Sequence, residues 1–565
     1  MTAGGFLLSL WVNIGIMDSF SISGHIVDVL NRTIYDGTVV IEGNRISEIR
    51  KEEVPSYAPY IMPGFTDSHI HIESTLLTPE HYAALAISKG VVAVVSDPHE
   101  IANVTGVEGV NFMIENGKKV HFHFYFGAPP CVPCTGFETA GAKLDSKDIG
   151  ELLKRDEIYG VAEFMNAFGV INGDKECMAK LNAARKAGKP VDGHAPGLTG
   201  SALARYAAHG ISSDHECANL EEGKERIANG MLVQIRQGSA AEDYDTLAPL
   251  LADNPGKVMF CSDDKYPNEL LEGYLDQMVA QSVEKGYPMW NVLEAACVTP
   301  VQHYALKHGL LRKGDNADFI LVDNLRDFNV LESWIDGVKV FAGGTVVKKN
   351  FIRDTAPTTA FPNKFAAEKI KVEDLRVPCT GGRLKVITAR DLSLRTGVEF
   401  VTPKVEDGCV VSDVDNDVLK IVVYNRYEKA KPQVAFIKGF QLKCGAMGST
   451  ISHDSHNIVA IGATDQDIVN VINILIEYKG GLLIADGMSV SGLALPVAGL
   501  MSPLDGEVVA KKYAALRLMA QSQGCPFNAP FMTMAFMSLP VIPELKITDK
   551  GLFDVNKFAF TDLME

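Results

Sequence analysis

The sequence lacks two features that would each place it in a distinct class of protein. No run of 18 or more apolar residues occurs, so no transmembrane helix is expected. Positive charge is scarce, since 53 Lys and Arg residues face 70 Asp and Glu residues and leave a formal net charge of −17. A field of that sign argues against nucleic acid or an anionic membrane as the main partner. We therefore expect a small-molecule substrate.

Cysteine is also sparse, with 10 residues in a chain of 565. The cysteines are scattered, at positions such as Cys177, Cys261 and Cys297, and they do not form the dense spacing of a disulfide framework. A long chain with this pattern is typical of a reducing compartment. We expect a cytoplasmic protein, and we also expect a homo-oligomer, namely a dimer.

The first residues are apolar but lack the features of an export signal. Residues 4–16, GGFLLSLWVNIGI, have no Lys or Arg before them and no small-residue cleavage site after them. They are too short to span a bilayer. Because Met17 precedes an ordinary polar sequence, we expect residues 1–17 to be a disordered extension that follows an upstream start codon. A signal-like segment is the alternative.

Strand-like and helix-like stretches alternate between residues 62 and 308. Helical stretches such as 79–89 and 174–187 are followed by Gly90 and Gly188, a common way for a helix to end. Eight βα units over roughly 240 residues predict a (β/α)8 barrel. The eight predicted strands are Met62–His71, Val91–Ser96, Val120–Phe126, Tyr159–Met165, Pro190–His194, Ile211–His215, Met231–Arg236 and Lys257–Ser262.

Short strand-like runs flank this barrel, and a further α/β pattern follows it. Residues 18–61 and 309–350 both contain short β-branched runs separated by turn residues, so we expect them to pair as one small β-sandwich domain, split by the barrel at 62–308. Residues 351–377 predict a linker, because prolines interrupt them. Residues 378–565 predict a C-terminal α/β domain.

Polar residues with metal-binding side chains follow several of the predicted strands. His69 and His71 occupy alternate positions, so in a strand they share one face and form half of a metal site. Each polar residue alone is more often structural. Because the active site of a (β/α)8 barrel lies where the strands end, the joint pattern predicts a metal centre. The other strand-end residues are Glu163, His194, His215, Asp263 and Asp264.

The order of these ligands and the amino-acid sequences of the motifs resemble those of a known family. An HxH pair followed by Glu, His, His and Asp is similar to the amidohydrolase superfamily. Within that superfamily, the motifs resemble the prokaryotic adenine deaminases, over nearly the whole chain from about residue 20. The motifs are PGFTDSHIHIESTLLTP, SDPHEIANV, GVAEFMN, DGHAPG, SSDHE, FCSDDKYPNEL, ITARDLSLRTG and SHDSHNIVAIGATDQDI.

This resemblance implies an activity and a cofactor. It implies hydrolytic deamination of adenine to hypoxanthine and ammonia, a step of purine salvage. Another aminopurine or a cyclic amide is the alternative substrate, because fold alone does not define substrate. It implies two divalent metal ions, Mn2+ or Fe2+, and the mixed nitrogen and oxygen ligands are also compatible with Zn2+. The implied ligands are His69, His71, Glu163, His194, His215 and Asp263.

The chemistry also needs groups that move protons. By the resemblance, Asp263 closes the first metal site and takes the proton of the attacking water, although the neighbouring Asp264 competes for that role. Protonation of the ring needs a second acid. We favour Glu100 because it lies at a strand end within the family motif, with Glu73 and Glu216 as alternatives. A structural carboxylate at a helix N-terminus is the simpler interpretation of Glu100.

The sequence gives less information about which residues bind the purine base of the substrate. Arg236, Gln237 and Ser239 follow the seventh predicted strand and are candidates for hydrogen bonds to the ring nitrogens of the substrate. Arg236 could equally form a salt bridge to a loop carboxylate. In the last domain, residues 452–457, SHDSHN, are rich in potential ligands. We expect a solvated loop there; the alternatives are that its His-x-x-His pair reaches over the barrel mouth or binds another ion.

Two rival interpretations lead to different experiments. His71 and Glu73, followed by Cys131 and Cys134, formally match the H-x-E…P-C-x-x-C signature of the small zinc nucleobase deaminases. Those domains are far smaller, and the match leaves the other strand-end ligands unused, so we reject it. The second rival is a non-catalytic relative that serves in assembly. Loss of ligands would indicate such a protein, and all six implied ligands are present here.

Overall fold

The computed structural model describes residues 19–239, 241–358, 360–391, 393–487 and 489–565. The predicted disordered extension at 1–17 lies outside these residues. Within them, no helix combines the length and the apolar composition that a membrane span requires. All ten cysteines are free thiols.

Eight parallel strands form the central sheet, and each pairs with the next strand along the chain. The first and last strands meet, because the backbone N–H of Asp263 donates to the carbonyl of His69 at 2.9 Å and the N–H of His71 donates to the carbonyl of Asp263 at 3.2 Å. The predicted (β/α)8 barrel is thereby confirmed. Its strands are β5 (Phe65–Ile70), β6 (Val91–Ser96), β7 (His123–Ala128), β8 (Ile158–Phe164), β9 (Val191–Gly193), β10 (Ser213–Asp214), β11 (Leu232–Arg236) and β12 (Val258–Cys261).

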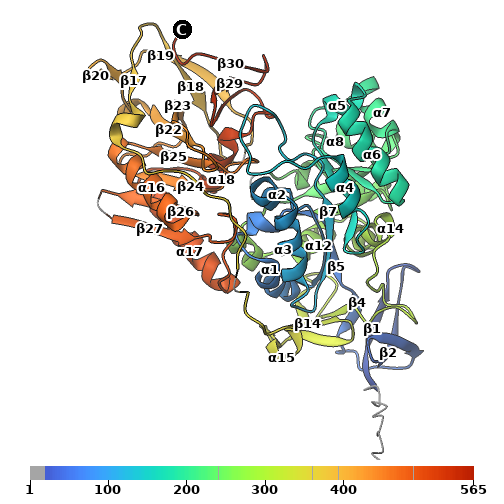
Figure 1. Ribbon diagram of the computed structural model, residues 1–565. Helices are drawn as coiled ribbons and strands as arrows, with labels where there is room; N and C mark the ends of the chain where they lie inside the picture. Colours follow the sequence, from blue (N-terminus) through green and yellow to red (C-terminus); the bar gives the residue numbers. More distant parts are fainter. Residues whose placement is uncertain (1–18, 240, 359, 392, 488) are drawn as a thin grey trace, which may run out of the picture.

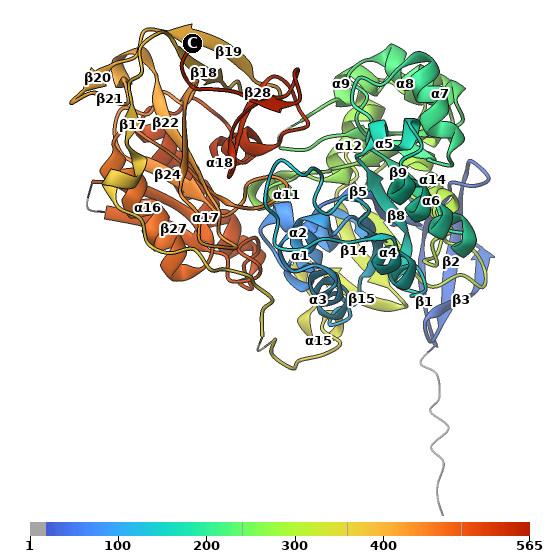
Figure 2. The same cartoon turned by 45° about the horizontal axis from the view of Figure 1, so that its top comes forward.

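Helices connect these strands and surround the barrel (Figure 2). Helix α6 shows how the sequence sets their limits: Asp174 caps its first turn by accepting from two backbone N–H groups, and Gly188 ends it with a φ of 65°. The helices are α1 (Pro79–Ala86), α2 (His99–Thr105), α3 (Val107–Gly117), α4 (Ser146–Leu152), α5 (Ala167–Ile171), α6 (Lys175–Ala187), α7 (Gly200–Ala208), α8 (Leu220–Ala228), α9 (Tyr244–Leu247), α10 (Leu250–Asp253), α11 (Pro267–Glu272), α12 (Leu275–Glu284), α13 (Met289–Leu293) and α14 (Thr299–His303).

A second eight-stranded sheet combines the segments before and after the barrel. Strand β4 pairs with β1 on one side and with β13 on the other, which joins the two segments into one sheet. We propose that this sheet is a small domain split by the barrel, with the predicted limits. Its strands are β1 (Ser19–Asp28), β2 (Thr33–Glu42), β3 (Arg45–Lys51), β4 (Tyr60–Pro63), β13 (Phe319–Val322), β14 (Val330–Ile335), β15 (Val338–Ala342) and β16 (Thr345–Val346), followed by helix α15 (Lys348–Phe351).

The C-terminal part contains a mixed eight-stranded sheet and two small three-stranded sheets. We propose that it is one domain, joined to the barrel by a linker at the predicted residues 351–377. Its elements are β17 (Val377–Pro378), β18 (Leu384–Thr388), β19 (Gly397–Val401), β20 (Val405–Glu406), β21 (Cys409–Val410), β22 (Leu419–Tyr424), β23 (Gln433–Lys438), β24 (Ala446–Ser449), β25 (Ile458–Gly462), α16 (Asp465–Tyr478), β26 (Gly481–Asp486), β27 (Ser489–Ala494), α17 (Gly506–Ser522), α18 (Pro530–Ala535), β28 (Leu545–Thr548), β29 (Gly551–Asp554) and β30 (Ala559–Phe560).

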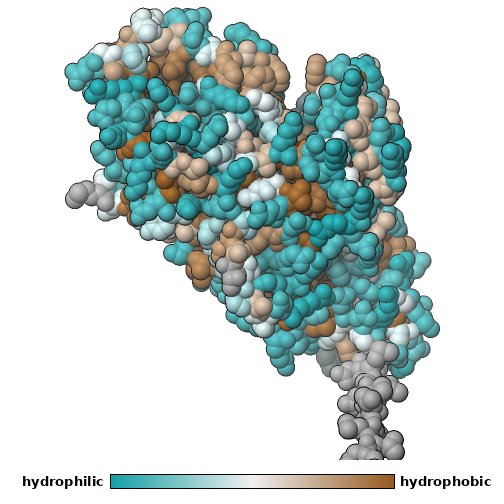
Figure 3. All heavy atoms as spheres, viewed as in Figure 1, coloured by the Kyte–Doolittle hydropathy of each residue, from teal (hydrophilic) through white to brown (hydrophobic). Residues whose placement is uncertain are grey.

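This C-terminal part lies against the barrel (Figure 1). Helix α17 packs on α1 and α11, and the N–H of Ser502 donates to the carbonyl of Leu76 at 2.8 Å. Between the two parts, the space-filling outline dips at the top of the view, whereas most of the visible face is hydrophilic (Figure 3). The contact places residues of the C-terminal part beside the ends of the barrel strands, where the candidate site lies.

Candidate metal centre

The predicted ligands all come from the ends of barrel strands. His69 belongs to β5 and His71 follows it, while Glu163 lies near the end of β8. His194 and His215 follow β9 and β10 by one residue each, and Asp263 follows β12 by two. Parallel strands of a barrel present their carboxyl ends at one face, so six side chains from distant parts of the sequence converge there.

Asp67 holds the first and last strands in register at this face. Its carboxylate accepts from the backbone N–H of His69 at 3.1 Å and from Oγ of Ser262 at 2.6 Å. Burial raises the pKa of Asp67 to about 6, against the hydrogen bonds from Ser262 and Tyr274 that lower it. Because Asp67 joins the two strand ends through these hydrogen bonds, Oδ1 of Asp263 lies close to Nε2 of His71, at 3.1 Å.

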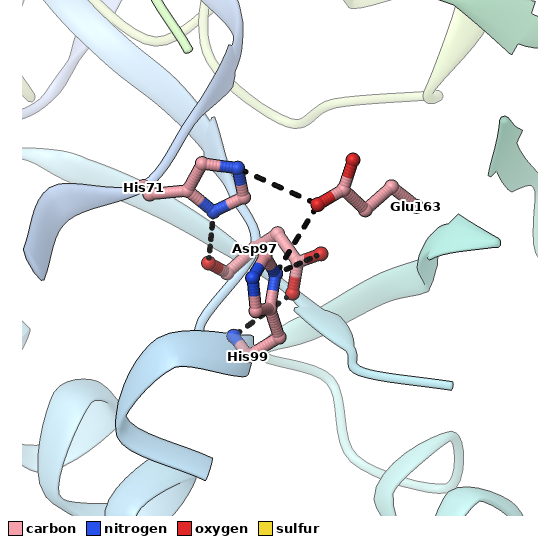
Figure 4. Close-up of side chains that lie close together, drawn as sticks. All are labelled: His71, Asp97, His99 and Glu163. Atoms are coloured by element: carbon pink, nitrogen blue, oxygen red, sulfur yellow. Dashed lines mark hydrogen bonds and ion pairs between the residues drawn. The ribbon is translucent and has the colours of Figure 1, made fainter. Parts of the chain in front are cut away.

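Glu163 lies at the centre of the cluster. Its Oε2 is 2.8 Å from Nδ1 of His194 and 3.2 Å from Nε2 of His215. Its Oε1 faces Nε2 of His71 at 3.6 Å (Figure 4). Burial would raise the pKa of this carboxyl, but His194 and His215 outweigh it and hold the pKa well below its usual range. The carboxylate therefore faces imidazoles on both sides.

The donor set fits a bound cation. Nε2 of His69 lies only 3.2 Å from Nε2 of His71, so two ring nitrogens converge on one space with a carboxylate beside them. Burial and His215 lower the pKa of His69. Neutral imidazole is the form that binds metal ions. Buried groups of neighbouring donor atoms that contain predicted ligands include His69, His71 and Asp263; His69, Glu163 and His215; and His71, Asp97, His99 and Glu163.

Two members of the cluster were not predicted. Nδ1 of His99 lies 3.1 Å from Oδ2 of Asp97 and 3.3 Å from Oε1 of Glu163 (Figure 4). Both residues are buried. The sequence did carry a signal, because Asp97 and His99 show at the end of β6 the alternate spacing that drew attention to His69 and His71.

The structure separates the two adjacent aspartates. Asp263 faces His69 at 3.6 Å and His71 at 3.1 Å, whereas Oδ1 of Asp264 accepts from Oγ of Ser74 at 2.5 Å. Oδ2 of Asp263 also accepts a hydrogen bond from Nη1 of Arg236 at 2.8 Å. Geometrically, Asp263 is the one that adjoins the imidazoles.

The predicted base-binding side chains contact other protein groups. Besides Asp263, Arg236 pairs with Glu216 at 2.5 Å and with Asp243 at 2.8 Å, which is the salt-bridge alternative. Gln237 donates to Glu242 at 2.8 Å. Oγ of Ser239 donates to Glu269 at 2.5 Å. Contacts of Arg236, Gln237 and Ser239 with a base stay a prediction.

A small cavity adjoins the cluster, and the C-terminal part forms its apolar wall. The cavity has a volume of about 30 Å³, and its apolar lining comes from Met165 together with Leu394, Phe536, Leu539 and Ile542. A larger cavity of about 1140 Å³ lies beside it, between the loop at 132–144, helix α5 and the β28–β30 region. Met165 and His194 line both cavities, so the two adjoin at these residues.

Comparison with known proteins identifies the family. The amidohydrolase family matches residues 60–347, and the adenine deaminase C-terminal domain matches residues 393–559. The adenine deaminase of Methanosarcina mazei is 46% identical over 553 residues, covering 96% of this chain and 98% of that protein. The adenine deaminase of Salinibacter ruber is 47% identical over 548 residues, covering 96% and 99%. The chain belongs to the adenine deaminase family of amidohydrolases.

Membership in this family confirms the resemblance seen in the motifs and excludes the rival zinc deaminase fold. Among solved structures, a D-hydantoinase superposes with a TM-score of 0.44 at 14% identity, over 58% of this chain and 96% of that one. The cysteines of the rival signature, Cys131 and Cys134, are free thiols, and burial raises the pKa of Cys131 to about 11. Amidohydrolases use divalent metal ions, and this chain buries donor groups that can hold them.

The expectation of a solvated loop at 452–457 is wrong. His453 is 3% exposed and His456 is 0% exposed. Both rings contact the carboxylate of Glu100, with Nδ1 of His453 at 2.7 Å from Oε1 and Nε2 of His456 on Oε2. The C-terminal part of this adenine deaminase family protein therefore contributes His453 and His456 beside the metal centre. It also contributes the apolar wall of the small cavity.

Proposed function

We propose that this protein hydrolyses adenine to hypoxanthine and ammonia with two divalent metal ions, Mn2+ or Fe2+, and that it serves purine salvage. The observation that carries the proposal is the convergence of four histidines, Glu163 and Asp263 in a chain that matches adenine deaminases over 96% of its length. Zn2+ is chemically compatible with the same donors.

The contacts support two neighbouring positions for the ions. His69, His71 and Asp263 would hold one ion, His194 and His215 would hold the other, and Glu163 would be shared between them. Metal ions bound there would lower the pKa of water and so supply hydroxide at neutral pH. His99 and Asp97 adjoin Glu163 from the outer side and support its orientation.

Two proton transfers complete the reaction. Asp263 takes the proton of the attacking water and delivers it to the leaving amine; Arg236 at 2.8 Å helps to keep this carboxylate ionised. Protonation of N1 falls to the buried cluster that contains Glu100, which lines the small cavity. Glu216 also lines the cavity but pairs with Arg236, and Glu73 is hydrogen-bonded to the N–H of Ile101.

The two cavities suggest how the base reaches the centre. The small cavity holds about one water molecule, so a purine needs additional room there. The larger cavity supplies the access route past Met165 and His194, and movement of the apolar wall from the C-terminal part enlarges the site. A planar base would then lie between the metal centre and Phe536, Leu539 and Ile542.

The decisive experiment is ammonia release from adenine, adenosine, guanine and cytosine by Mn2+-loaded protein. We expect turnover of adenine alone, and loss of that turnover in the Glu163→Gln variant. Turnover of another aminopurine would replace adenine as the substrate. Metal binding without turnover of the panel would direct the search to cyclic amides, and protein that binds no metal would refute the enzyme assignment.

Two coarser proposals accompany this function. We propose a homodimer in the cytoplasm. Light scattering coupled to gel filtration, with a mass of twice the 61.2 kDa chain as the expected result, tests the first. Fractionation of cells tests the second. The ten free thiols agree with a reducing compartment.

A further inference from the structure

Two histidines of the C-terminal part are hydrogen-bonded to one buried carboxylate of the barrel. Glu100, in the first turn of α2, receives Nδ1 of His453 on Oε1 at 2.7 Å and Nε2 of His456 on Oε2. All three side chains are at most 3% exposed. The contacts join residues 353 and 356 positions apart in the sequence.

The hydrogen bonds assign the protons in this cluster. The backbone N–H of Ser452 donates to Nδ1 of His456 at 3.4 Å, so the proton of that ring is on Nε2, which donates to Glu100. His453 donates through Nδ1. Glu100 thus accepts two N–H bonds and is an ionised carboxylate with no proton to give. His453, His456 and the neighbouring His99, whose Nε2 lies 3.4 Å from Oε1 of Glu100, lower its pKa well below the usual range, although burial raises it.

The same proton assignment argues against a third metal ion. The donor atoms of Glu100, His453 and His456 lie close enough together to hold one. However, a ring nitrogen that carries a proton has no free electron pair for a metal, and Nε2 of His456 carries one. The cluster is therefore better described as a hydrogen-bonded group that holds a proton.

His453 is the member of this cluster that is built to hold that proton next to the substrate. It lines the small cavity, whereas His456 lies behind Glu100. Its ring stacks on Phe536 with centroids 4.3 Å apart and planes at 17°, and its backbone N–H donates to the carbonyl of Ala535 at 3.1 Å. Among the residues that the structure describes, Nε2 of His453 has no hydrogen-bond partner, so this nitrogen is left for a ligand in the cavity.

The charges around His453 favour its cation. Glu100 contacts it, Asp264 and Asp454 face it, and the ring of His456 lies 5.6 Å away. Burial opposes protonation, but these carboxylates raise the pKa of His453 to about 9, whereas burial lowers the pKa of His456 to about 4. One ring is cationic at neutral pH and the other is neutral.

We propose that His453 is the acid that protonates the purine ring at N1, and that Glu100 and His456 are positioning residues that orient and charge it. The inference rests on the proposed deaminase function. It moves the second acid from Glu100 to His453, and it makes the C-terminal part a supplier of a catalytic group.

Protons and bonds balance over the proposed reaction. The water oxygen bonds to C6 while its proton goes to Asp263, and the His453 cation gives its proton to N1 and becomes neutral. The C6–N6 bond then breaks as Asp263 returns the proton to the amine, which leaves as ammonia. The proton of the new hydroxyl on C6 restores the His453 cation, and hypoxanthine is the product.

Three variants test the proposal on Mn2+-loaded, full-length protein. His453→Asn keeps a donor near the Nδ1 position but has no acidic proton. We expect kcat for adenine to fall by about 10²–10⁴-fold, with two metal ions still bound, and the loss of activity at high pH to disappear from the kcat profile. Glu100→Gln should shift that loss to lower pH, because the cation loses its carboxylate. His209→Asn, on the surface at the end of α7, is the matched control.

Each outcome separates the inference from the proposed function. Wild-type protein that does not deaminate adenine refutes the function. Wild-type deamination with unchanged kcat and pH profile in His453→Asn overturns the inference and leaves the function standing. If His453→Asn binds less metal than wild type, Glu100→Gln decides: an unmoved high-pH loss overturns the proposal, and a shift to lower pH supports it.

Discussion

Oε2 of Glu163 lies 2.8 Å from Nδ1 of His194, and the same oxygen lies 3.2 Å from His215. The other oxygen faces His71 and His99. One carboxylate thus contacts imidazoles from four strand ends, although it carries only a single charge. Glu163 is the nearest carboxylate to both His194 and His215 and also contacts two further imidazoles, which makes it the most informative residue to change.

The first prediction concerns this residue. Glu163→Gln should lower metal affinity by more than about 100-fold, because a neutral amide replaces the anionic group that we propose both ions share. Metal content after dialysis against a weak chelator, measured by mass spectrometry, checks this. Glu115→Gln, whose side chain is 64% exposed, is the control and should retain wild-type metal content. Equal metal content in both variants would contradict the bridging role.

The second prediction concerns a buried arginine behind the metal ligands. Nε of Arg226 lies 2.9 Å from Oδ2 of Asp214, and its other nitrogens donate to the carbonyls of Ala195 and Leu198 at 2.6 Å. These contacts tie together the chain next to His194 and His215. Arg226→Gln should therefore lower the free energy of unfolding by about 3–5 kcal/mol and metal affinity by about 10–100-fold.

Urea unfolding and metal titration measure the two effects of the Arg226 change. The matched control is Arg185→Gln, which removes an exposed arginine from the end of α6. A loss of stability with unchanged metal affinity would show that the arginine supports the fold but not the ligand positions.

The third prediction concerns pH and a buried lysine. Lys546 donates to the carbonyls of Leu394 and Phe536 at 2.8 and 2.9 Å, and burial lowers its pKa to about 7. Since the unfolded lysine has a pKa of about 10.4, the unfolded chain binds more protons between these values. The contribution of Lys546 to the free energy of unfolding therefore rises with pH, by up to about 1.4 kcal/mol per pH unit. The rise ends above a pH of about 10.4, where the lysine is neutral in both the folded and the unfolded chain.

Comparison with Lys546→Met isolates this contribution. The difference in unfolding free energy, wild type minus variant, should grow as pH rises from 7 to 9 in urea titrations. Parallel curves for the two proteins would show that the lysine has an ordinary pKa in the folded state.

The fourth prediction concerns the rejected cysteine signature. The double variant Cys131→Ser/Cys134→Ser should keep the metal content of the wild-type protein, because the proposed ligands are the strand-end residues and not these thiols. Metal analysis of the purified variant is sufficient. Loss of metal would revive a site built on these cysteines.

The barrel was predictable because its signal is local. Each strand is a short apolar run, and β6, VVAVVS, is buried on both faces as parallel strands usually are. The predicted and observed limits of β6 coincide, whereas the run at 211–215 contains only the two paired residues of β10. Pairing with neighbours, which the sequence does not display, decided where that strand begins.

The convergence of the candidate ligands was also predictable, since barrel geometry brings all strand ends together. The environment of Glu100 was not. Its partners lie more than 350 positions away in another part of the chain, and a polar segment such as 452–457 has the composition of a solvated loop. Burial of His453 and His456 depends on docking between two parts of the molecule, which no local pattern records.

The closure of the barrel has a further consequence. The hydrogen bonds that join β5 to the end of β12 involve the backbones of His69, His71 and Asp263, whose side chains belong to the metal cluster. Opening this seam would separate the donor atoms, so an ion bound to all three side chains would oppose the opening. The amide protons of His71 and Asp263 should then exchange with deuterium more slowly as the ion concentration rises, and the backbone itself becomes a reporter of occupancy.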